Sequence, residues 1–233
     1  MKQIQSLFVT LFLALASSCS TAQQSVDALI VVDIDHTLGV QSVAKPDFDS
    51  ESVATIANDK DGSFYFYKGS LDFLKTLFRW RDEEASRGKK VQIALFTMAT
   101  GERNEVIRNF IEDRLAKSRG TLGLYDYGDA VFSEELVTAW KSPGPVLSSG
   151  WIDYLASLKR PLRVEKLPAG IRYFKDLSNL LGFYEGLKLE NVRLVDDNDK
   201  AVPASQKHQH IVFGPQIDYL PALAQLKDFL SLL

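Results

Sequence analysis

Cysteine is almost absent from this chain, because Cys19 is the only one in 233 residues. One cysteine near the N-terminus cannot form a disulfide within the folded part, nor supply the thiolates of a structural zinc site. An excess of positive charge is also lacking, since 27 lysine and arginine residues stand against 30 aspartate and glutamate residues. Without a basic stripe, nucleic-acid binding is not expected. No apolar run reaches the roughly 20 residues of a membrane-spanning helix.

The N-terminus has the order of segments that is typical of a secretory signal peptide. Lys2 is followed by an apolar stretch from Leu7 to Ala16 and then by small residues up to Ala22. We expect residues 1–22 to be cleaved, and the protein to be exported: periplasmic, envelope-anchored or secreted. One alternative is a bacterial lipobox ending at Cys19, whose lipid anchor would be the only expected membrane contact. A retained N-terminal anchor is the other.

Acidic residues directly follow an apolar run at the start of the predicted mature chain. Ala28–Val32 is apolar throughout, as in a strand buried on both faces of a parallel sheet, and Asp33 and Asp35 come next. In open α/β sheets, ligands bind outside the carboxyl ends of the strands. Two carboxylates there repel each other unless they hold a divalent cation or divide into nucleophile and proton donor. An acidic turn without function is the alternative reading of this motif alone.

Apolar strands alternate with amphipathic helices along the rest of the chain. We predict strands at 28–33, 91–96, 130–132, 191–195 and 210–213, and helices from 70 onward, at 101–117 and at 217–233. This alternation predicts an α/β fold with a doubly wound parallel sheet. Residues 41–61 are polar and are expected to be a loop or flap, whereas 63–67 is β-prone. We expect 23–233 to be one domain with an insertion at about 140–170.

Four short motifs carry a family resemblance. They are Asp33–Thr37 (DIDHT), Leu95–Thr97 (LFT), Tyr173–Ser178 (YFKDLS) and Val195–Asp197 (VDD). In this order they resemble the motifs of the haloacid dehalogenase-like (HAD) superfamily, and within it the NIF-type branch that includes the C-terminal-domain phosphatases of RNA polymerase. The resemblance covers most of the chain from Ala28 onward and implies a HAD-like Rossmannoid sheet, with the insertion between the second and third motifs.

The resemblance implies roles for five residues in phosphoryl transfer. Asp33 would be the nucleophile that forms an aspartyl-phosphate, and Asp35 would be the general acid and then the general base. Thr97 and the backbone at Ile34 would hold the phosphoryl oxygens. Lys175 would neutralise charge on both Asp33 and the phosphate.

The resemblance also implies a Mg²⁺ cofactor. Its ligands would be a carboxylate oxygen of Asp33, the backbone carbonyl of Asp35, and Asp197, with waters and phosphate completing an all-oxygen shell. Asp196 is expected to orient Lys175 or a water from just outside that shell, or simply to form a turn.

The function implied is a phosphomonoester hydrolase that acts on phosphoproteins or small phosphomonoesters. A second hypothesis is a catalytically silent peptide- or protein-binding module on the same fold. The presence of both Asp35 and Lys175 favours the enzyme. Arg103, just after the second motif, is expected to be an exposed helix residue, with substrate contact as the alternative. Neither motif nor composition predicts an oligomeric state.

Overall fold

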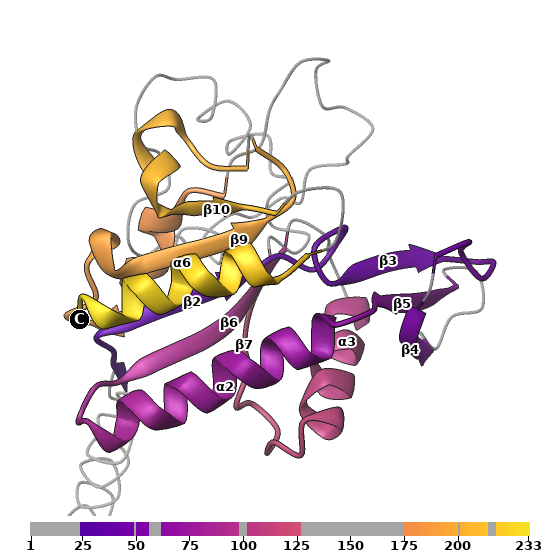
Figure 1. Ribbon diagram of the computed structural model, residues 1–233, viewed down its shortest axis with the longest axis horizontal. Helices are drawn as coiled ribbons and strands as arrows, with labels where there is room; N and C mark the ends of the chain where they lie inside the picture. Colours follow the sequence, from indigo (N-terminus) through magenta and orange to yellow (C-terminus); the bar gives the residue numbers. More distant parts are fainter. Residues whose placement is uncertain are drawn as a thin grey trace, which may run out of the picture.

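The computed structural model describes residues 24–48, 50–55, 62–97, 102–126, 175–199, 201–213 and 218–233. At its centre lies a five-stranded parallel sheet in the order β10-β9-β2-β6-β7 (Figure 1). Its strands are β2 (Ala28–Val32), β6 (Val91–Thr97), β7 (Gly123–Asp126), β9 (Val192–Asp196) and β10 (His210–Val212). The predicted α/β fold with a parallel sheet is therefore confirmed. The predicted signal peptide, the predicted strand at 130–132 and the insertion at about 140–170 lie outside the described residues.

Strand β2 occupies the middle of the sheet because both of its faces are buried. None of its residues is more than 1% exposed. Leu29 and Val31 join the apolar cluster on one face, whereas Ala28, Ile30 and Val32 join the cluster on the other. A run without polar residues is what such a strand requires.

The strand order reverses beside β2. From β2 the chain passes through α2 (Ser70–Ser86) to β6 and through α3 (Glu102–Arg114) to β7, while β9 and β10 lie on the other side of β2. Right-handed crossovers in one direction place their helices on the same face. Accordingly α2 and α3 pack into one cluster, and α6 (Leu220–Ser231), which follows β10, joins the same cluster; Figure 1 shows α2 and α6 on this face. The opposite face is covered by the 3₁₀ helix η3 (Leu177–Phe183).

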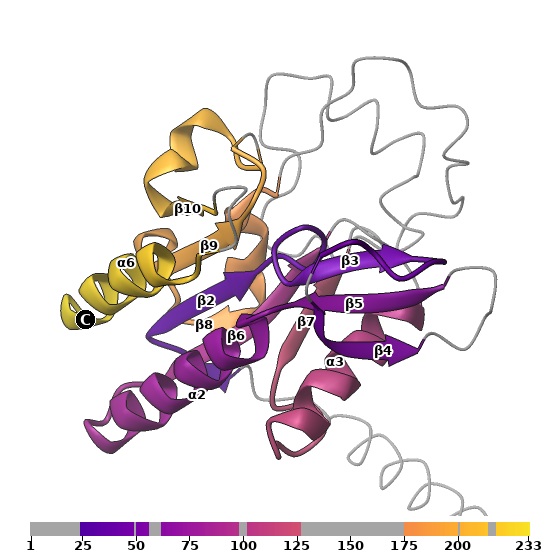
Figure 2. The same ribbon diagram turned by 45° about the vertical axis from the view of Figure 1, so that its right-hand side comes forward.

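A second sheet of three antiparallel strands lies beyond the carboxyl ends of the central strands (Figure 2). Its order is β3 (Gly39–Ser42), β5 (Ser63–Tyr67), β4 (Ser50–Thr55). Residues 41–61 were expected to form a loop or flap, and the loop is wrong for 41–42 and 50–55, which lie in strands of this sheet, whereas the β-prone segment 63–67 is a strand as expected. The polar sequence of β4 is misleading because β4 is an edge strand.

Aromatic side chains of β5 hold the small sheet to the rest of the molecule. Phe64 and Phe66 are fully buried, and the Phe66 ring stacks on Phe110 of α3 with centroids 5.2 Å apart. β3 and β5 approach so closely that a Cβ at Gly39 would lie 2.1 Å from the Tyr65 carbonyl oxygen. Glycine is required at position 39 for this reason.

The remaining described elements are short. β1 (Gln24–Ser25) pairs with β8 (Tyr184–Glu185), and two 3₁₀ helices, η4 (Leu189–Asn191) and η5 (Ala204–Gln209), flank β9. The sequence of residues 175–181 predicts a short helix or turn, and η3 overlaps this segment. Over the described residues, no helix has the combination of length and apolarity that crossing a bilayer would require.

We predict that His210, the first residue of β10, makes the folded protein less stable in acid. It is buried, and its ring nitrogens have no hydrogen-bond partner among the described residues. Burial lowers the pKa of His210, with Lys207 and Lys175 adding to the effect and the Asp196 charge opposing it. The unfolded chain therefore binds a proton at His210 more readily than the folded protein does. The free energy of unfolding should be unaffected by His210 above about pH 6.5 and should decrease below that pH, by at most about 1.4 kcal/mol per pH unit.

The measurement is urea unfolding between pH 5 and 8 for the wild type, His210→Leu and His208→Leu. His208 is exposed, so its variant should keep the wild-type slope. A flatter slope is expected for His210→Leu alone. Equal slopes in all three proteins would contradict the assignment.

Candidate functional site

Polar residues end three neighbouring strands of the central sheet. Asp33 directly follows β2, Thr97 is the last residue of β6, and Asp196 is the last residue of β9. β2 lies between β9 and β6, and the Asp33 N–H donates to the Val195 carbonyl oxygen at 2.9 Å. The sheet therefore brings these predicted site residues together at one edge, where its strand order reverses.

Lys175 is buried against two of these carboxylates. Its Nζ forms an ion pair with Oδ1 of Asp33 and another with Oδ2 of Asp196 at 2.6 Å. Lys175, Asp33 and Asp196 are 3%, 6% and 2% exposed. The Lys175 N–H donates to the Ala201 carbonyl oxygen at 2.6 Å, which ties the start of this segment to the loop after β9.

Burial dominates the electrostatics of this group. It raises the pKa of Asp33 to about 7, with the charges of Asp196 and Asp35 adding to the effect and the Lys175 ammonium opposing it. Burial would lower the pKa of Lys175, but the carboxylates of Asp33 and Asp196 outweigh burial and raise it. Lys175 is therefore a permanent cation, while the charge of Asp33 depends on what else binds beside it.

Thr37 connects Asp33 to Asp197. Its buried hydroxyl oxygen lies 3.4 Å from a carboxylate oxygen of each, and it accepts a hydrogen bond from the Asp197 N–H at 3.0 Å. The Thr37 carbonyl in turn accepts a hydrogen bond from the Tyr219 hydroxyl at 2.7 Å. Because Tyr219 immediately precedes α6, the C-terminal helix is tied to the loop that carries Asp33.

Asp35 lies on the open side of the site. Its side chain is 33% exposed, and its backbone forms an isolated bridge with Gly39. The carboxylate forms an ion pair with Arg103, in the first turn of α3. The Arg103 side chain is only 15% exposed, so the expectation of an exposed helix residue is wrong.

Three carboxylates are close enough to hold a metal ion. Asp33, Asp196 and Asp197 each present an oxygen, and these oxygens lie within 4.8 Å of one another. Asp35 adds a fourth carboxylate, Asp199 lines the same cavity, and Lys175 and Arg103 are the two cations paired with this group. The excess of negative charge and the all-oxygen donor set fit a divalent cation such as Mg²⁺.

The predicted ligand set overlaps this group without coinciding with it. Asp33 and Asp197 belong to both. Asp196, predicted to orient Lys175, contacts Lys175 and also belongs to the carboxylate group. Burial, with the charge of Asp196, raises the pKa of Asp197. The role of the Asp35 backbone carbonyl stays a prediction.

The predicted side chains line a common cavity of about 510 Å³. Its lining consists of Asp33, Asp35, His36, Thr97, Lys175, Asp196, Asp197, Asn198, Asp199 and Ala201. The Ile34 side chain is fully buried in the core instead. Ile34 can therefore serve the site through its backbone alone, as the resemblance implies.

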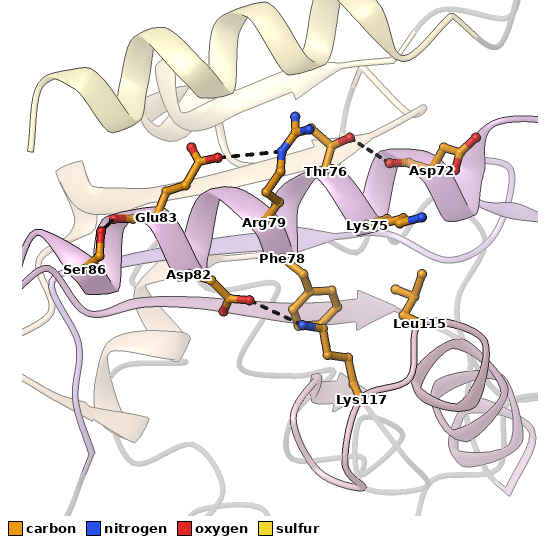
Figure 3. Close-up of a pocket in the computed structure, with 10 residues that line it drawn as sticks. All are labelled: Asp72, Lys75, Thr76, Phe78, Arg79, Asp82, Glu83, Ser86, Leu115 and Lys117. Atoms are coloured by element: carbon orange, nitrogen blue, oxygen red, sulfur yellow. Dashed lines mark hydrogen bonds and ion pairs between the residues drawn. The ribbon is translucent and has the colours of Figure 1, made fainter.

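A larger groove of about 800 Å³ lies along α2, beside the chain that leaves α3 (Figure 3). Four of its charged side chains form ion pairs with one another: Asp82 lies 3.4 Å from Lys117, and Arg79 lies 3.7 Å from Glu83. None of the predicted site residues lines it. We assign no chemistry to this groove.

Comparison with known proteins identifies no family or function for this chain. No protein-family model and no curated protein matches the chain. Among solved structures, a variant of the RNA polymerase II CTD phosphatase Fcp1 of fission yeast, bound to beryllium fluoride, is similar over 89% of this chain, with a TM-score of 0.40 and 12% identity. The alignment covers 50% of the phosphatase, so this chain spans about half its length. A likeness this weak carries no function.

Three residues of the site were not predicted. Thr37 was part of the first motif without a role, Arg103 was expected to be an exposed helix residue or to contact substrate, and Tyr219 was not singled out. Thr37 could have been found from the DIDHT motif. The other two lie 68 and 182 positions from the groups they contact, and no local pattern signals such contacts.

We predict that Mg²⁺ stabilises the protein through the carboxylate group. Mg²⁺ should raise the midpoint temperature of thermal unfolding. A ligand that binds only the folded state adds about 2.7 kcal/mol to the free energy of unfolding at about 100 times its Kd. Asp197→Asn should lose most of this shift. Asp228→Asn, an exposed change on α6, should keep all of it. An unchanged shift in Asp197→Asn would place the cation elsewhere.

Removal of the buried ammonium should be strongly destabilising. Lys175→Met leaves Asp33 and Asp196 buried without a cation, so the metal-free protein should lose about 3–5 kcal/mol in urea unfolding. Lys188→Met is the matched control. Lys188 forms an exposed ion pair with Glu190 at 3.9 Å, which contributes at most about 1 kcal/mol. Similar losses in both variants would refute a special role for Lys175.

Proposed function

We propose that this chain is a Mg²⁺-dependent phosphomonoester hydrolase of the HAD-like superfamily, in its NIF-type branch, with Asp33 as the nucleophile. The observation that carries this proposal is the contact of buried Lys175 with Asp33 and Asp196, at the sheet edge where the strand order reverses. Asp33 lies beside a permanent cation and within a cluster of carboxylates that can hold a metal ion. Such a carboxylate is suited to attack an anionic phosphate.

The first half-reaction forms an aspartyl-phosphate. An oxygen of Asp33 bonds to phosphorus while the bond between phosphorus and the ester oxygen breaks. Asp35 gives its proton to the departing oxygen, which leaves as a neutral alcohol. Lys175 and the Thr97 hydroxyl hold the phosphoryl oxygens as charge accumulates on them.

The second half-reaction returns the enzyme to its starting state. Asp35, now ionised, takes a proton from a water whose oxygen bonds to phosphorus as the Asp33–phosphorus bond breaks. Phosphate leaves, and Asp35 is again protonated. A Mg²⁺ ion held by Asp33, Asp197 and neighbouring oxygens would lower the repulsion between the anionic nucleophile and the anionic substrate.

The substrate class within this proposal is a phosphoprotein or a small phosphomonoester. Export through the N-terminal 22 residues, with a lipid anchor at Cys19 as the alternative, is part of the same proposal. It rests on the sequence pattern of that segment.

The test is hydrolysis of para-nitrophenyl phosphate by the full chain, in Mg²⁺ and in EDTA. Turnover should require Mg²⁺ and fall more than about 10³-fold in Asp33→Asn, because the nucleophile is lost. Asp228→Asn should retain the wild-type rate. Folded, metal-replete protein that hydrolyses neither this ester nor a panel of phosphopeptides and phosphorylated metabolites would instead support the silent binding module.

A further inference from the structure

Asp35 is held differently from the other carboxylates of the site. Asp33 and Asp196 are buried against Lys175, whereas the Asp35 side chain is partly exposed toward the cavity. Across the described ranges, the carboxylate of Asp35 has one ion-pair partner, Arg103, which engages Oδ1. Its Oδ2 is the oxygen left to carry a proton.

Arg103 is itself fixed by its surroundings. It lies in the first turn of α3, which begins at Glu102, five positions after Thr97, the last residue of β6. Its guanidinium carbon lies over the Phe64 ring, 5.7 Å from the centroid. Phe64 is fully buried in β5, so the small antiparallel sheet supplies one wall of the site that holds Arg103.

We propose that Arg103 is a positioning residue for the proton transfers of Asp35. This inference rests on the proposed function. With Oδ1 held by the guanidinium, the carboxyl group keeps one orientation, and the proton travels on Oδ2. In the first half-reaction that proton moves from Oδ2 to the departing ester oxygen. In the second it moves from the attacking water to Oδ2, so the proton count of Asp35 is restored.

This role makes the effect of Arg103 depend on the leaving group. An alkoxide must be protonated as it departs, so an alkyl phosphate needs a correctly placed acid. para-Nitrophenolate is a stable anion that departs without a proton. Loss of a residue that merely supports the fold, or that binds the phosphoryl group, would slow both substrates alike.

The experiment compares kcat/KM for glycerol 2-phosphate and para-nitrophenyl phosphate in the full chain with Mg²⁺. Using kcat/KM confines the comparison to steps up to formation of the aspartyl-phosphate. Arg103→Met should lower the value about 10- to 100-fold for the alkyl ester and less than about 3-fold for the aryl ester. Asp35→Asn should show the same selectivity with a larger loss, about 10²- to 10⁴-fold for the alkyl ester.

Arg108→Met is the matched control. Arg108 lies on the same helix, its side chain is also partly buried, and it pairs with Glu105. Arg108→Met should leave kcat/KM unchanged for both substrates. Equal losses for the two substrates in Arg103→Met, or no loss for either, would overturn the positioning role. Failure of the proposed function is separately visible, because the wild type would then show no turnover, or Asp33→Asn would keep it. Either result also overturns this inference.

Discussion

The buried contact of Lys175 with Asp33 and Asp196 constrains everything around it. Two carboxylates in an apolar setting are costly unless a cation lies between them, and an ammonium without them would be costly in the same way. The fold must therefore deliver all three groups together. β2 delivers Asp33, β9 delivers Asp196, and the backbone hydrogen bond from Lys175 to Ala201 fixes the segment that carries the lysine.

Even so, one ammonium does not neutralise the site. Asp197 adds a third carboxylate to the pair that Lys175 contacts, and Thr37 joins it to Asp33 through a hydroxyl group. An excess of negative charge held so rigidly is unfavourable for the protein alone and favourable for binding a cation. Burial raises the pKa of Asp33, and the charges of Asp196 and Asp35 add to the effect, so a cation bound in the cavity would change the ionisation of Asp33.

The small antiparallel sheet forms one wall of the site, beside Arg103 and the partly exposed Asp35. It inserts between β2 and α2, so the chain leaves the first motif, forms three antiparallel strands and returns before the first crossover helix begins. Through Phe64 and Phe66 it packs against Arg103 and Phe110 of α3. A segment that precedes the second motif in sequence thereby supports a residue that follows it.

Much of the central fold could be predicted from the sequence. The apolar run before Asp33 predicted a strand buried on both faces, and the alternation of strands and helices predicted a parallel sheet, since both patterns reflect local burial. The strand β7 was missed because its four residues include glycine and aspartate and carry no apolar run. β4 was missed because an edge strand needs few apolar residues.

The sequence by itself determined which chemistry is available: acidic residues at the ends of apolar strands, one lysine motif, and no thiol chemistry in the folded part. Only the tertiary structure decided which of these groups meet. Lys175 reaches Asp33 across 142 positions, and Arg103 reaches Asp35 across 68. Local patterns record whether a residue is buried, whereas its partners depend on the order of the strands in the sheet and on the packing of helices and the small sheet around their ends.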